Sequence, residues 1–302
     1  YEIECKVIKD DKTVNIALEH DIKPQKTQKI NLSEPLCGEN VFVELTYKRN
    51  GKICGSEQHI VKRTLPVITQ KQGGEIKVTE NEKFYIFDCR NVKYYFSKHT
   101  AMFEKIEKDG KNYLSDKKSL FYNPYTAVNS FMPNIYRYKM DNDMYIGSKW
   151  REHGFDMMWN RVLSYNVEKV GCDYKITVDS LFSPPKRSKE FTNKFVYTIF
   201  ANGDLGVDCT LIKENEKLPY LPRYGFLLNP NENLFDKVEW KGFGPNENYS
   251  DYKEAAKVGT YSKDIKDMFY EYVSPQENGE RCGVSHLSLF GKNGAKLSVY
   301  AN

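Results

Sequence analysis

The amino-acid sequence predicts an all-β protein, in which a small sandwich segment precedes a large antiparallel sandwich with one or two short helices. Apolar and polar residues alternate through most of the 302 residues, for example at Leu205, Val207, Cys209 and Leu211. A period of two is typical of strands that bury one face. Strands and helices do not alternate along the chain, which argues against a parallel barrel or a dinucleotide-binding sheet.

Turn signals separate the alternating runs. Asn50-Gly51 and Asp109-Gly110 lie between such runs, Asn202-Gly203-Asp204 follows the strand-like segment 195–200, and Gly291-Lys292-Asn293-Gly294 comes before Leu297. Asn-Gly and Asp-Gly favour tight hairpin turns, because these turns need positive φ angles at both central residues. The sequence therefore predicts four β-hairpins.

The chain divides at one Pro- and Gly-containing stretch. Residues 1–68 contain four or five short strands, which fit part of an immunoglobulin-like sandwich. Residues 69–75 form the predicted linker, and residues 76–302 form the predicted large sandwich. No residue of the first segment indicates chemistry, and we interpret that segment as a spacer.

Two stretches interrupt the strand pattern. Residues 121–143 have no period and end in Asp141-Asn142-Asp143, which predicts an Asx-rich turn, with Asp141 and Asp143 as weak candidates for a cation site. The stretch 149–159 predicts a short helix with Trp150, Phe155, Met158 and Trp159 on one side, because their spacing is near three to five residues. Such a stripe is more often core than binding site.

Composition excludes several function classes. The net charge of +4, from 45 basic and 41 acidic side chains, gives no electrostatic case for nucleic acid. Seven cysteines without a CxxC pair, and five scattered histidines, favour reduced thiols over disulfides or a zinc site. No apolar run is long enough to cross a membrane. Without a signal segment we expect a cytoplasmic protein. Both ends look cut, so the missing true N-terminus leaves secretion open.

Two polar loops are the candidate site. Strand 238–243 runs into Pro245–Asp251, and a second loop of similar chemistry spans Pro275–Arg281. Hydrogen-bonding loops on a rigid scaffold are common places for function, although such loops often bind only each other or a neighbouring domain. We expect the loops to meet, with Arg281 pairing with Glu247 or Glu277. The candidate carbohydrate or inter-domain contacts are Trp240, Glu247, Asn248, Tyr249, Asp251, Glu277, Asn278 and Arg281.

The segments WKGFGPNENYSD and YVSPQENGERCG resemble the C-terminal domain of the large, five-domain glycoside hydrolases of the β-galactosidase type. The resemblance implies a supersandwich with a galactose mutarotase-like fold, preceded by part of the family's fourth, immunoglobulin-like domain. It also implies that both catalytic glutamates lie on a barrel that precedes this chain, so that no catalytic residue and no cofactor belong to the chain itself.

Further expectations follow from the same resemblance. The complete enzyme would act on a β-galactoside or other glycan, and the resemblance is compatible with divalent and monovalent cations and with a homo-oligomer. Nucleic acid and membrane are not expected partners. In the family, an arginine–proline segment leads into Asp-Asn-Asp. Here Asn123-Pro124 and Asp141-Asn142-Asp143 match its two ends, about sixteen residues separate them, and we do not find the expected arginine.

Three functions remain open at this point. The first is the non-catalytic C-terminal portion of a β-galactosidase, which supports the catalytic barrel and subunit assembly. The second is a stand-alone carbohydrate-binding module that uses Trp240, Glu247, Asn248 and Tyr249. The third is a mutarotase-like epimerase, which would need a histidine, such as His286, near Glu247 or Glu277. The sequence favours the first.

Overall fold

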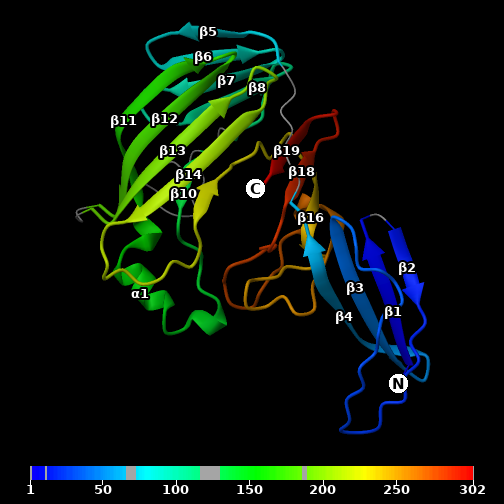
Figure 1. Cartoon of the computed structure of the whole chain (residues 1–302). Coiled ribbons are helices and arrows are strands. Elements are labelled where there is room, and N and C mark those ends of the chain that lie inside the picture. The colour runs from blue at the N-terminus through cyan, green and yellow to red at the C-terminus, as the bar shows by residue number, and fades with distance from the viewer. Residues whose placement is uncertain (1, 11, 66–72, 116–129, 186–188, 302) are drawn as a thin grey trace.

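The computed structural model describes residues 2–10, 12–65, 73–115, 130–185 and 189–301. In these residues almost all regular structure is antiparallel β-sheet, and the remainder is one short α-helix and three 3₁₀ turns (Figure 1). Within the described ranges, no helix is long and apolar enough to span a membrane. All seven cysteines have free thiols. The predicted all-β class is confirmed.

The N-terminal segment forms one four-stranded sheet in the order β2-β1-β3-β4. Cys5, Val7, Val41 and Val43 are buried on one face of this sheet. The last strand of this sheet, β4, lies beside the large domain. The strands of this sheet are β1 (Glu2–Lys9), β2 (Lys12–Ile16), β3 (Asn40–Arg49) and β4 (Lys52–Arg63).

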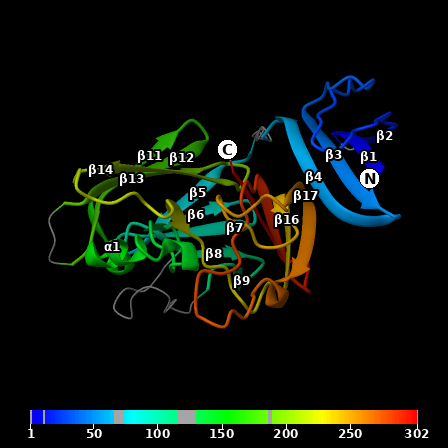
Figure 2. The ribbon, with the colours of Figure 1, turned by 90° about the horizontal axis from the view of Figure 1, so that it is seen from below.

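Two sheets face each other in the large domain (Figures 1 and 2). The first contains β5 (Ile76–Glu80), β6 (Phe84–Cys89), β7 (Val92–Ser97), β8 (Phe103–Lys108) and β9 (Lys111–Asn112). The second contains β11 (Trp159–Val170), β12 (Asp173–Ser183), β13 (Phe191–Ile199) and β14 (Leu205–Lys213). Each sheet is a meander, in which sequence neighbours pair with one another, so short hairpins are sufficient to connect the strands.

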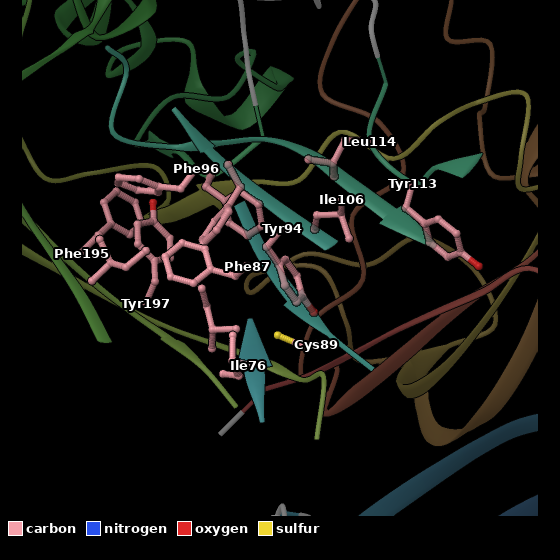
Figure 3. Packing of buried hydrophobic residues seen from close by; sticks show 14 of the residues in the cluster. Ile76, Phe87, Cys89, Tyr94, Phe96, Ile106, Tyr113, Leu114, Phe195 and Tyr197 are labelled. Carbon is pink, nitrogen blue, oxygen red and sulfur yellow. The ribbon is translucent and has the colours of Figure 1, made fainter. Parts of the chain in front are cut away.

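Aromatic side chains fill the space between these two sheets (Figure 3). Along β13 the buried positions alternate with more exposed ones, and Phe195 and Tyr197 point into the core. Their rings stack 5.3 Å apart, and Tyr197 also packs edge-on against Phe103 at 5.2 Å. Such edge and offset contacts contribute beyond the area that the rings bury.

A third sheet carries the candidate loops. Its order is β17-β16-β18-β19, and its strands are β16 (Lys237–Gly244), β17 (Lys257–Asp264), β18 (His286–Phe290) and β19 (Lys296–Tyr300). Val238, Trp240 and Leu289 on its inner face belong to the main core. A small sheet of β10 (Met132–Asn134) and β15 (Gly225–Leu227) completes the domain.

Side chains join the N-terminal sheet to this third sheet. The amide of Gln58 on β4 accepts a hydrogen bond from the backbone N–H of Val258 at 2.8 Å and donates to its carbonyl at 3.2 Å. Lys257 forms an ion pair with Glu44 at 3.6 Å. In both views β4 lies beside the strands of the third sheet (Figures 1 and 2). Strand β17 is thus held at its edge by side chains rather than by another strand.

The predicted hairpins are confirmed. Asn50 and Gly51 have φ angles of 52° and 73° between β3 and β4, and Asp109 and Gly110 have 51° and 72° between β8 and β9. The segment 202–204 connects β13 to β14, and the segment 291–294 connects β18 to β19. The predicted linker lies largely outside the described residues, as does Asn123-Pro124.

The predicted helix is shorter than expected. Helix α1 (Gly147–Glu152) is followed by the 3₁₀ turn η2 (Phe155–Met157), with Gly154 at a φ of 73° between them. Trp150, Phe155 and Met158 are buried as expected. The placement of Trp159 on the same helical side is wrong, because Trp159 begins β11 and is 52% exposed. Two further 3₁₀ turns are η1 (Asp141–Asp143) and η3 (Ile265–Asp267).

Candidate functional site

Four segments meet beyond the end of β16, and we refer to them together as the polar loop cluster. They are residues 137–143, 221–223, 245–251 and 275–282. Their joining contacts are hydrogen bonds and ion pairs rather than apolar packing. The two loops that the sequence singled out are part of this cluster, and the other two segments bring Arg137 and Arg223, which the sequence analysis did not select.

Direct hydrogen bonds confirm that the two predicted loops meet. Glu247 accepts from the backbone N–H of Gly279 at 2.8 Å. Asn248 accepts from the N–H of Cys282 at 2.8 Å through its side-chain oxygen, and its own N–H donates to the Glu280 carbonyl at 3.0 Å. Asn248 is only 1% exposed. A buried amide that bridges two loops in this way fixes their relative position, because leaving those groups unpaired costs free energy.

The predicted pairing of Arg281 with Glu277 is wrong. Arg223, not Arg281, forms the ion pair with Glu277, whose other oxygen accepts from the backbone N–H of Tyr138 at 3.0 Å. Arg281 instead donates to the carbonyls of Gly279 and Glu280, each at 3.0 Å. Burial lowers the pKa of Arg281, and the nearby Glu247 charge opposes that shift.

Three of the predicted residues are buried and do not present a surface to a ligand. Trp240 is 1% exposed, its indole N–H donates to the Phe243 carbonyl at 3.0 Å, and the Arg281 guanidinium lies 5.3 Å from its ring centre. Tyr249 is 5% exposed, and burial raises the pKa of its hydroxyl. With Asn248, these residues form the floor of the loops. A sugar could not stack on Trp240 without displacing Arg281.

The remaining predicted residues tie the cluster to its surroundings. Asp251 accepts a hydrogen bond from the side chain of Asn142. Asn278 accepts from the backbone N–H of Tyr270 at 3.0 Å and donates to the carbonyl of the same residue. Asn278 thereby holds the segment 269–273, in which Phe269, Tyr270 and Val273 are exposed.

An arginine does precede Asp141-Asn142-Asp143. Arg137 forms a two-pronged ion pair with Asp143, and both side chains are about nine-tenths buried, with 11% and 10% exposure. Asp143 also accepts from the backbone N–H of Met140 at 2.8 Å. The expectation that this arginine is absent is therefore wrong. Arg137 lies only four positions before Asp141 and is well separated from Asn123-Pro124 in the sequence.

Asp143 is therefore already occupied by a cation of the chain itself, which leaves it poorly suited to bind a metal ion. In the described part of the chain, no group of three or more His, Cys, Asp or Glu side chains is arranged to hold a metal ion. Asp141 is exposed on the same 3₁₀ turn.

Glu280 is the most unusual carboxylate of the cluster. Burial raises its pKa, as does the neighbouring Glu277, while Arg223 and Arg137 oppose the shift. Shifted carboxylates can mark catalytic acids, but the basic groups near Glu280 already serve Glu277 and Asp143. A retaining glycosidase needs two carboxylates about 5–5.5 Å apart around the bond that it cleaves, whereas Glu247 and Glu277 are engaged by the backbone N–H of Gly279 and by Arg223.

The histidine required by the epimerase alternative lies elsewhere. His286 on β18 stacks on Tyr300, with ring centres 4.5 Å apart, and its Nε2 is 2.9 Å from the Ser288 hydroxyl. Burial and the charge of Lys296 lower its pKa. The nearby carboxylate that raises this pKa is Glu239, rather than Glu247 or Glu277.

The fold and this site define a large antiparallel β-sandwich protein whose polar loops interlock at one end of a sheet. Comparison with known families then identifies the group. A family described as the β-galactosidase small chain matches residues 88–302, and the chain belongs to this family.

Curated relatives agree with this assignment. The chain is similar to β-galactosidases from Actinobacillus pleuropneumoniae (31% identical over 196 residues), Alteromonas mediterranea (33% over 176) and Kluyveromyces lactis (25% over 260). The matches cover 64%, 52% and 84% of this chain, but only 18%, 16% and 24% of the relatives. The chain thus spans about a fifth of the length of these proteins.

Proposed function

We propose that this chain is the non-catalytic C-terminal portion of a β-galactosidase, an enzyme that removes terminal β-D-galactose residues. The hydrolytic site would lie in the part of the enzyme that precedes the matched region. The chain's own role would be to support that catalytic part and subunit assembly through the polar loop cluster.

The construction of the cluster is the observation that carries this proposal. Three of its acids are bound to the chain's own groups: Asp143 to Arg137, Glu277 to Arg223, and Glu247 to the N–H of Gly279. Around these satisfied groups lie exposed aromatic side chains, namely Tyr138, Tyr145, Tyr220, Tyr252, Phe269 and Tyr270. A rigid polar floor with exposed aromatic residues is typical of a protein–protein contact surface.

The carbohydrate-binding alternative has less support. It relied on Trp240 and Tyr249, which are almost fully buried. The epimerase alternative relied on a histidine beside Glu247 or Glu277, and His286 lies beside Glu239 instead. Neither alternative explains the similarity to β-galactosidases along most of the chain.

The first test is the activity of the chain by itself. We expect no hydrolysis of a nitrophenyl β-galactoside or of lactose, and no acceleration of galactose anomer exchange, when each is followed by proton NMR. Hydrolysis by the isolated chain would place the chemistry here and overturn the proposal.

The second test asks for the supporting role. The A. pleuropneumoniae β-galactosidase would be shortened by the region that this chain matches, and then produced with and without the chain. We expect β-galactosidase activity only when both are present. A Tyr270→Asp variant of the chain should restore less activity, whereas Ile53→Asp, at an exposed position of the N-terminal hairpin, should restore as much as the unmodified chain.

A further inference from the structure

Arg63 reaches from the N-terminal sheet to the base of the polar loop cluster. It is the last residue of β4, and its guanidinium donates to the backbone carbonyl of Gly283. These two residues are 220 positions apart in the chain. The contact therefore connects two parts of the molecule that no neighbouring sequence holds together.

The guanidinium of Arg63 is partly desolvated. Burial lowers the pKa of Arg63, and no carboxylate contributes to that shift. Among the described residues, no ion pair within 4.0 Å involves Arg63. Removing water from a cation without pairing it with a carboxylate costs free energy. The hydrogen bond from Arg63 to the Gly283 carbonyl offsets part of this cost.

Gly283 directly follows the cluster and has a backbone conformation that few residues other than glycine adopt. Its φ angle of 58° lies in the left-handed region, and a side chain there would meet Arg63 Nη1 at 3.0 Å and the ring of Phe243 at 3.1 Å. The turn thus needs glycine for two reasons, backbone conformation and space. Arg63 occupies the space that a side chain at position 283 would take.

A continuous set of hydrogen bonds leads from this turn into the site. The carbonyl of Cys282 accepts from the N–H of Phe243 at 3.1 Å, and the N–H of Cys282 donates to Asn248 at 2.8 Å. Asn248 in turn binds the Glu280 carbonyl at 3.0 Å. Gln58 and Glu44 hold β3 and β4 against β17 on the same side of the molecule. Because Arg63 ends β4, these contacts also fix the position of Arg63 relative to Gly283.

We infer that Arg63 is a positioning residue, through which the N-terminal sheet holds the turn 279–283 and hence the polar loop cluster in place. This inference does not depend on the proposed function. Without the Arg63 contact, the turn would open locally while the sandwich core stays folded. The sequence alone indicated that the N-terminal segment is a spacer. With this contact, the segment also holds the loops of the large domain in place.

Thiol labelling distinguishes local opening from global unfolding. Cys282 lies in the turn and is partly buried, Cys89 lies in the core, and Cys172 is exposed. In Arg63→Met we expect the rate of Cys282 labelling by a maleimide to rise about tenfold, since a hydrogen bond from a charged group is lost. The labelling rates of Cys89 and Cys172 should not change.

The control substitutions are made at Arg63 itself and at its neighbour on β4. Lys62→Met, at the exposed neighbouring position, should leave all three labelling rates unchanged. Arg63→Lys keeps the charge and one donor, and should restore part of the protection of Cys282. Hydrogen exchange at the Cys282 amide, which donates to Asn248, should follow the same order among the variants.

Two results would overturn the inference. One is an unchanged Cys282 rate in Arg63→Met. The other is a parallel rise at Cys282 and Cys89, which would show that Arg63 supports only overall stability. Should Arg63→Met not fold, Gln58→Ala offers the same comparison, because it releases β4 from β17 without altering the cluster.

Discussion

At the scale of single residues, the site is built from charges that the chain itself neutralises. Arg137 with Asp143 closes the segment 137–143 on itself, whereas Arg223 with Glu277 joins two segments that are 54 positions apart in the sequence. Arg137 also lies 5.4 Å from the ring centre of Trp150, so its guanidinium is enclosed by a carboxylate and an aromatic face. Arginine suits such a place because its planar group binds two oxygens and stacks at once.

Removing one member of the buried pair should be costly. We expect Arg137→Met to lower the free energy of unfolding by about 3–5 kcal/mol, because Asp143 would remain buried without its cation. The double variant Arg137→Met/Asp143→Leu should lose less than the sum of the two single variants. Urea denaturation of all four proteins measures the difference, and strict additivity would contradict a direct coupling.

Glu280 should make stability depend on pH. Its pKa is raised in the folded protein above the ordinary 4.5, chiefly by burial. The folded state therefore binds this proton more tightly than the unfolded state does. The contribution of Glu280 is most favourable below that value and is lost as the pH rises through the folded pKa.

The test compares wild type with Glu280→Gln from acidic to neutral pH. We expect the wild type to lose unfolding free energy relative to the variant as the pH rises. Glu254→Gln, at an exposed position, serves as the control and should leave the pH profile unchanged. A difference that grows in the opposite direction would mean that Arg223 and Arg137 dominate the environment of Glu280.

At the scale of elements, strand β16 of the third sheet lies very close to residues 283–285, which follow the loop 275–282. Gly242 on β16 has no room for a side chain, since an added Cβ would lie 2.9 Å from Val284 Cα and 3.0 Å from the Gly283 carbonyl. The N–H of Ser285 donates to the Lys241 carbonyl at 2.9 Å across the same gap. Close packing of backbone on backbone is what places the loop 275–282 above β16.

Gly242→Ala should therefore push the turn away from the strand. We expect a loss of about 1–3 kcal/mol in unfolding free energy, as is usual for overpacking. Gly225→Ala on β15 is the matched control, because an added Cβ there meets nothing within 4 Å. If the two variants were equally stable in thermal or urea unfolding, the claim that Gly242 leaves no room for a side chain beside Val284 would be wrong.

The elements were largely predictable because strands and hairpin turns have local signals. Asn50-Gly51 and Asp109-Gly110 specify their turns within two residues. The site was predictable only in part. The loops 245–251 and 275–281 stood out by composition, but the pairing of Glu277 with Arg223 depends on which strand ends the fold brings together. Residues such as Arg63 carry no local signal, since their role appears only across 220 positions.

At the scale of the whole molecule, the segment 269–273 presents exposed apolar and aromatic side chains close together in the sequence. Phe269 is 71% exposed, Tyr270 63% and Val273 fully exposed, on a backbone held by Asn278. Apolar side chains grouped and ordered in this way promote association when no partner covers them.

The isolated chain should consequently associate in a concentration-dependent manner. We expect sedimentation velocity to show the association, and Phe269→Ser/Val273→Ser to weaken it. Ile53→Ser removes an apolar side chain of similar exposure, 67%, from the N-terminal hairpin and should have no such effect. Monomeric behaviour of the unmodified chain at all concentrations would exclude this surface as the cause.

The contact between Gln58 and Val258 has a consequence for how such chains meet one another. A side-chain amide there offers one acceptor and one donor to the edge of β17, which is what a neighbouring peptide group would offer. An incoming strand from a second molecule would find this position of the ladder already taken. The chain thus blocks one position at this edge of the third sheet with a glutamine side chain, whereas β19, the edge strand on the other side of the same sheet, has no outer strand partner among the described residues.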